Sequence, residues 1–108
     1  TVVTINEDYL VRMMYLKSGK TKYQASELLY KTVNIYCFSL SSHINVVQPE
    51  VKHLLDRGAY QSYYEEAFAQ AIKKQTLAMK AVSFVDQLWY EIDTPEDFEK
   101  AKDLFRDE

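Results

Sequence analysis

YKTVNIYCF, residues 30–38, is the strongest β-strand signal in the chain. Both of its alternate faces are largely apolar, one formed by Val33, Ile35 and Cys37 and the other by Asn34, Tyr36 and Phe38. A strand that is covered on both sides is typical of the middle of an α/β sheet. We therefore expect residues 30–38 to form a central strand. Left at a sheet edge, such a strand invites self-association between chains.

The flanking sequence adds extended segments at residues 1–5, 11–16, 77–85 and 88–92, although the pattern of 11–16 also fits a helix. Ser18–Thr21 marks a loop. No repeat, low-complexity segment or Pro/Ser linker divides the chain, so residues 1–108 are expected to form one unit. Strands and helices in mixed order predict an α/β or α+β fold.

Helix signals follow the strand. Ser41 or Ser42 can cap a short helix, and a second helix is expected to begin at Pro49 and end at Gly58. The apolar face of this second helix is predicted to contain Val51, Leu54 and Leu55. Ser62–Glu65 has the pattern of a capping box that opens a third helix.

A last helix is expected to begin at Thr94, with Thr94 as its cap, Pro95 at its first position and Asp97 reaching back to the cap. Its predicted core residues are Phe98, Ala101, Leu104 and Phe105.

The composition limits the function. With 13 basic and 16 acidic residues and no basic stripe, the chain is not expected to bind nucleic acid. A single cysteine, Cys37, fits a reducing cytoplasm and is expected to be buried, and no apolar run approaches the ~20 residues of a membrane span. The two glycines, Gly19 and Gly58, cannot form a phosphate-cradling loop, which needs several closely spaced glycines.

WYEIDTPED, residues 89–97, is the most specific motif. An apolar strand that ends in Asp93 and runs straight into a helix places this acid where open α/β sheets gather ligands. A carboxylate there can hold Mg²⁺ against phosphate oxygens. A structural alternative also fits, since an acid beside a helix N-terminus is favoured by the helix dipole, and Asp97 is explained as a capping partner.

Residues 89–105 (WYEIDTPEDFEKAKDLF) resemble the C-terminal signature of nucleotidyltransferases in the sugar-nucleotidyltransferase-like superfamily. They are most similar to the cytidylyltransferases that act on phosphocholine and related phosphorylated small molecules. The strand YKTVNIYCFS and the helix start YYEEAF occur in similar order in such enzymes. The resemblance runs from about Tyr30 to Phe105.

This resemblance implies a partial nucleotidyltransferase sheet with helices, the acceptor-side half of a Mg²⁺-dependent cytoplasmic enzyme. The nucleotide-binding half, with its glycine-rich loop and a first metal-binding aspartate, is missing, and Asp93 matches the second aspartate. A phosphate oxygen of the acceptor would attack the α-phosphorus of CTP or another NTP and release pyrophosphate. The implied acceptors are phosphocholine, an aminoalkyl phosphonate or a sugar phosphate, and the isolated chain is expected to be inactive.

Five further residues are candidates for acceptor binding. Aromatic faces and a carboxylate suit an amine, which singles out Tyr64, Glu65 and Trp89. Glu91 belongs to the same motif as Trp89, and Lys31 is placed to reach a phosphate. Each of four has a structural alternative: Tyr64 in the core, Glu65 as a helix cap, Trp89 filling a gap between layers, and Lys31 at a solvated edge.

A non-enzymatic hypothesis stands beside this one. The nine tyrosines would then form the partner surface of a small α+β interaction module, because a polar-tipped ring suits an interface. His43 and His53 have no acid at catalytic spacing and are expected at the surface.

Overall fold

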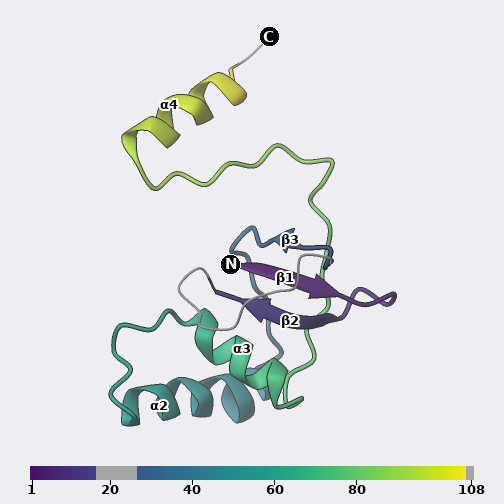
Figure 1. Cartoon of the computed structure of the whole chain (residues 1–108), viewed down its shortest axis with the longest axis vertical. Helices are drawn as coiled ribbons and strands as arrows, with labels where there is room; N and C mark the ends of the chain where they lie inside the picture. Colours follow the sequence, from purple (N-terminus) through teal and green to yellow (C-terminus); the bar gives the residue numbers. More distant parts are fainter. Residues whose placement is uncertain (17–26, 107–108) are drawn as a thin grey trace.

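A small antiparallel sheet is followed in the chain by helices, which gives an α+β fold (Figure 1). The computed structural model describes residues 1–16 and 27–106, so the loop predicted at residues 18–21 lies outside the described residues. The elements are β1 (Val2–Ile5), β2 (Val11–Tyr15), β3 (Tyr30–Lys31), α1 (Leu40–Ser42), the π-helical turn η1 (His43–Val47), α2 (Gln48–Asp56), α3 (Glu65–Lys73) and α4 (Pro95–Leu104).

The sheet has the order β2-β1-β3, with β1 antiparallel to both neighbours. Val2 lies opposite Tyr15 on β2 and opposite Lys31 on β3. The turn between β1 and β2 is held by Asn6, whose side-chain oxygen accepts hydrogen bonds from the backbone N–H groups of Asp8 and Leu10. The predicted strands at residues 1–5 and 11–16 are thus confirmed, and the sheet is not a parallel one.

The prediction of a central strand at residues 30–38 is wrong. β3 has two residues, and pairing ends where the Thr32 N–H donates to the Thr1 carbonyl. Asn34 then adopts a left-handed φ of 61°, which is incompatible with a continuing strand. Beyond it Tyr36 and Phe38 pack against the core, whereas Ile35 and Cys37 are exposed, so the expected burial of Cys37 is also wrong.

The strands predicted at residues 77–85 and 88–92 are also wrong in extent. Only Lys80 forms a bridge, opposite Leu10, flanked by hydrogen bonds from the Val11 N–H to the Met79 carbonyl and from the Ala81 N–H to the Tyr9 carbonyl. Residues 79–81 therefore extend the sheet beside β2, and residues 88–92 have no regular structure.

The helix starts were only partly predicted. Ser39, rather than Ser41 or Ser42, caps α1, and the helical backbone continues through η1 into α2. Pro49 lies in the first turn of α2, and Gly58 follows its end with a φ of 77°. The predicted capping box at residues 62–65 is wrong, because Tyr64 at the start of α3 makes no side-chain capping bond.

The core lies between residues 3 and 79, where α3 packs against β2 on one side and α2 on the other. Its buried members are Val3, Met14, Val47, Leu54, Ala67, Phe68, Ala71, Ile72 and Leu77. Leu55, predicted on the core face of α2, is exposed. No helix in residues 1–16 and 27–106 has the length and apolarity of a membrane span.

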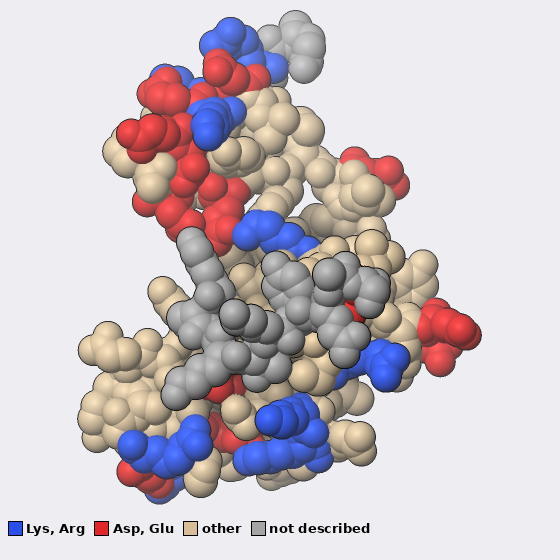
Figure 2. Space-filling view, viewed as in Figure 1, with Lys and Arg blue, Asp and Glu red and all other residues tan. Residues whose placement is uncertain are grey.

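Helix α4 stands apart from this core (Figure 1) and contacts none of the other elements. Its predicted capping box is confirmed: Thr94 accepts from the Asp97 N–H, and Asp97 accepts from the Thr94 N–H. The expected burial of Phe98, Leu104 and Phe105 is wrong, and Ala101 alone of the four predicted core residues is buried. On the face shown in Figure 2, acidic side chains gather over α4 with Lys and Arg side chains among them, and both signs also occur around α2 and α3.

Candidate functional site

Glu91 joins two segments that are far apart in the sequence. Its Oε1 accepts a hydrogen bond from Asn34 Nδ2 at 2.8 Å, and its Oε2 pairs with Lys31 Nζ at 3.1 Å. The hydrogen bond from Lys31 is the largest influence on the Glu91 pKa, and with the Asn34 bond it outweighs partial burial and lowers that pKa below the usual value. Two predicted site residues, Lys31 and Glu91, are therefore in direct contact.

Trp89 lies beside the same ion pair. Lys31 Nζ is 5.8 Å from the centroid of the indole ring, within the range of a cation–π contact. The ring is partly buried, and Trp89 is the single tryptophan of the sequence. Its fluorescence therefore reports on this part of the molecule alone.

Glu65 lies in a second cluster, at the start of α3. Glu65 as a residue is 9% exposed, and its carboxylate accepts a hydrogen bond from the Tyr36 hydroxyl at 2.8 Å. The Tyr36 ring packs against Tyr64 and Phe68, with centroids 6.1 and 5.0 Å away. Burial first, and then the Glu65 carboxylate, raise the pKa of the Tyr36 hydroxyl, although a bond with Thr32 opposes the shift. Glu65 is a buried carboxylate rather than the helix cap that the sequence suggested.

Tyr64 belongs to the Glu65 cluster through its ring contact with Tyr36. Its side chain is half-exposed, so it does not lie in the core. Burial of the hydroxyl, followed by the charges of Glu65 and Glu91, raises its pKa. The structure places the five predicted acceptor-binding residues on the two sides of residues 31–36, with Trp89 and Glu91 at Lys31 and with Tyr64 and Glu65 at Tyr36.

Asp93 follows Glu91 by two residues, a span of at most about 7 Å along an extended chain. Its backbone N–H donates to Asp97 Oδ2 at 3.1 Å. The Asp93 side chain is exposed, and no side chain in the described part of the chain donates a hydrogen bond to its carboxylate. Asp97 accepts from two backbone N–H groups, those of Asp93 and Thr94, which lowers its pKa.

Asp93 fits Mg²⁺ only as a single ligand. Within residues 1–16 and 27–106, no three His, Cys, Asp or Glu side chains converge as a metal site. Mg²⁺ commonly takes one or two protein carboxylates and fills its other positions with water and substrate phosphate. A shared site, completed by phosphate oxygens and a second carboxylate from elsewhere, is the arrangement that these residues allow.

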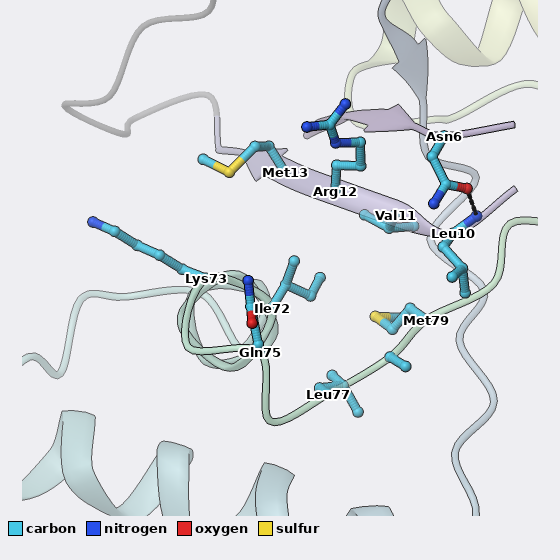
Figure 3. Close-up of a pocket in the computed structure, with 11 residues that line it drawn as sticks. Asn6, Leu10, Val11, Arg12, Met13, Ile72, Lys73, Gln75, Leu77 and Met79 are labelled. Atoms are coloured by element: carbon cyan, nitrogen blue, oxygen red, sulfur yellow. Dashed lines mark hydrogen bonds between the residues drawn. The ribbon is translucent and has the colours of Figure 1, made fainter. Parts of the chain in front are cut away.

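A hollow of the described surface lies away from these residues. It has a volume of about 420 Å³ and lies between β2, the end of α3 and residues 77–79 (Figure 3). Two of its residues, Arg12 and Lys73, are cationic, but Figure 3 shows their side chains pointing in different directions. They do not converge on one anion, and none of the predicted site residues lines this hollow.

Two residues of the site region were missed by the sequence reasoning. Asn34 and Tyr36 were placed on a strand face, yet they hold Glu91 and Glu65 respectively. The available signal for them was the presence of two side chains with polar groups, Asn34 and Tyr36, in the otherwise apolar run 33–38. His43 and His53 are exposed, as predicted.

Comparison with protein-family models, with curated proteins and with solved structures found no match to this chain. Function is therefore inferred from the residues and their arrangement.

Proposed function

We propose that the chain is the acceptor-side part of a Mg²⁺-dependent nucleotidyltransferase, which moves a cytidylyl or other nucleotidyl group from an NTP to a phosphorylated small molecule. One observation supports this most: residues 31–36 contact Trp89 and Glu91 through Lys31 and Asn34, and contact Tyr64 and Glu65 through Tyr36. They carry a cation, buried and exposed carboxylates and aromatic rings, and Asp93 lies next to them in the sequence.

Glu65 supports an acceptor that carries an ammonium group. Within the described residues its only hydrogen-bond partner is the neutral Tyr36 hydroxyl, and it forms no ion pair. A buried carboxylate without a cation is costly, so a cationic ligand would be favoured there. The rings of Tyr36 and Tyr64 beside it suit a quaternary or primary amine.

Lys31 and Asp93 would serve the phosphate end of the reaction. Lys31 is about half exposed while paired with Glu91, so its ammonium group can still contact a phosphate. Asp93 would provide one oxygen ligand to Mg²⁺, which when bound neutralises charge on the phosphates. In the proposed reaction an acceptor phosphate oxygen attacks the α-phosphorus and pyrophosphate leaves, so the protein acts by positioning and charge.

The test compares Asp93→Asn with the parent sequence in a longer protein that also carries the nucleotide-binding half. Pyrophosphate release from CTP is measured with phosphocholine, 2-aminoethylphosphonate or a hexose phosphate as acceptor. Asparagine keeps the shape but loses the charge, so turnover should fall about a hundredfold or more, several kcal/mol at ~1.4 per tenfold. Higher Mg²⁺, or Mn²⁺, should restore part of it.

Asp103→Asn is the matched control, since Asp103 is an exposed aspartate of α4 that pairs with Arg106 within that segment. It should leave turnover unchanged. Equal and mild effects at both positions would favour the interaction module instead. The isolated chain should release no pyrophosphate at all, and release that Asp93→Ala abolishes would contradict the fragment proposal.

A further inference from the structure

The C-terminal arm, residues 82–106, makes its polar contacts with the rest of the described chain at one place. Residues 82–94 have no helix or strand, and α4 contacts none of the other elements. Among the described residues, every hydrogen bond and ion pair between the arm and residues 1–81 is made by Glu91. The cation–π contact of Trp89 with Lys31 lies at the same place.

We propose that Lys31, Asn34 and Glu91 form a clasp that fixes the arm against β3, and that Asn34 is a positioning residue for Asp93. Each oxygen of the Glu91 carboxylate has its own partner, Asn34 for Oε1 and Lys31 for Oε2. Two charge-assisted contacts in different directions fix the orientation of a carboxylate as well as its place. A lone exposed ion pair would contribute little by itself.

The backbone of Asn34 suits this task. Its left-handed φ of 61° turns the chain just after β3, and asparagine is one of the few residues that adopt this conformation readily. Its side chain is thereby presented at the end of the strand, where it also accepts a bond from Thr32. Both the conformation and the amide N–H group are needed, and asparagine supplies both.

The clasp and the cap of α4 together define the path of Asp93. Glu91 is held by the clasp, and the backbone N–H groups of Asp93 and Thr94 are held by Asp97. Of residues 91–94, Ile92 is the one that takes part in none of these hydrogen bonds. The consequence for metal binding at Asp93 rests on the proposed function, whereas the attachment of the arm does not.

The attachment is tested on the full chain without nucleotide, acceptor or metal. Acrylamide quenching of Trp89 measures its exposure, and chymotrypsin cleavage after Trp89 or Tyr90 measures release of the arm. Glu91→Gln removes the ion pair, and Asn34→Asp keeps the shape and the left-handed tendency but replaces the amide donor with a charge that repels Glu91. Both variants should increase the cleavage rate about three- to tenfold, the range for losing a charge-assisted bond at a partly exposed position.

Two comparisons separate the clasp from a general loss of stability. Glu99→Gln breaks an ion pair of the same 3.1 Å length inside α4 and should leave quenching and cleavage unchanged. The charge swap Lys31→Glu with Glu91→Lys should restore resistance that either change alone removes. The clasp is wrong if Glu91→Gln and Asn34→Asp behave like the parent, if Glu99→Gln loosens the arm equally, or if the swap restores nothing. A failed transfer assay at Asp93 would leave these results intact, which distinguishes the two proposals.

Discussion

Two glutamates of the candidate site lie in opposite environments. Glu65 is buried against a neutral tyrosine at the first turn of α3, where the helix dipole favours its charge. Glu91 is partly exposed and paired with a lysine and an amide, which lowers its pKa. In the first arrangement the described residues provide no cation for the carboxylate, and in the second the carboxylate uses its charge to join two segments.

Tyr36→Phe tests the environment of Glu65. Phenylalanine retains the ring contacts with Phe68 and Tyr64 but removes the hydrogen bond to the carboxylate. A buried acceptor that loses its partner costs about 1–3 kcal/mol of unfolding free energy. Urea unfolding measures the loss, with Tyr63→Phe at an exposed tyrosine as the control. Equal stability of the two variants would mean that the bond contributes nothing.

The Glu91 clasp should open in acid. Because the folded-state pKa of Glu91 is lowered, its stabilisation is present above the unfolded value of about 4.3 and is lost as pH falls through the lower, folded value. Trp89 fluorescence should therefore be constant near neutral pH and change only below the usual glutamate range. Glu91→Gln should abolish the transition, which separates Glu91 from Glu65 and Asp93. A transition near the histidine value of about 6.5 would contradict the assignment.

At the scale of elements, local signals predicted some helix ends and missed others, such as the box expected at residues 62–65. The Thr94/Asp97 box and the Gly58 stop depend on neighbours in the sequence, and both occur. Residues 30–38 and 88–92 have the apolar content of strands, but a strand also needs a pairing edge, which the sequence does not reveal. At residues 79–81 the edge of β2 provides a pairing partner, but for these three residues only.

The candidate site was likewise predicted only in part from the sequence. Lys31, Trp89 and Glu91 were found individually, from residue type and from the motif that contains two of them. Their contact joins positions more than fifty residues apart, as the separation of 57 between Asn34 and Glu91 shows. Asn34 and Tyr36 were missed because each binds a carboxylate that is distant in the sequence, Glu91 for Asn34 and Glu65 for Tyr36.

Gly58→Ala tests the end of α2. Gly58 has a φ of 77°, and a Cβ added there would meet no atom within 4 Å. The cost should therefore come from the left-handed backbone alone, about 1 kcal/mol. Chemical unfolding measures it, and Gly58→Asn should cost less because asparagine tolerates this conformation. An alanine variant as stable as the parent would show that the backbone at the end of α2 rearranges.

At the scale of the whole molecule, the core and the arm differ in packing. The radius of gyration is 15.9 Å, above the ~13 Å expected for a compact domain of about 100 residues. The buried core cluster stops at Leu77, whereas the arm exposes Val82, Val85, Leu88, Phe98 and Phe105. Such apolar surface is unusual on a monomer in water.

Self-association is the expected result, driven more by the arm than by residues 30–38. Val85 and Leu88 are 84% and 63% exposed, and burying such side chains against a second chain is worth up to roughly 1.5–3 kcal/mol each. The mass measured by sedimentation equilibrium should rise with concentration. Val85→Glu with Leu88→Glu should shift association to higher concentration, because each charge would have to be desolvated on contact. Each single change, Val85→Glu or Leu88→Glu, should also shift it, and Gln87→Glu is compared with these because it adds the same single charge to the same segment without removing an apolar side chain, so it should have the smaller effect. A monomeric mass at every concentration would contradict self-association, and an equal shift in the Gln87 variant would assign the effect to net charge rather than to the apolar arm.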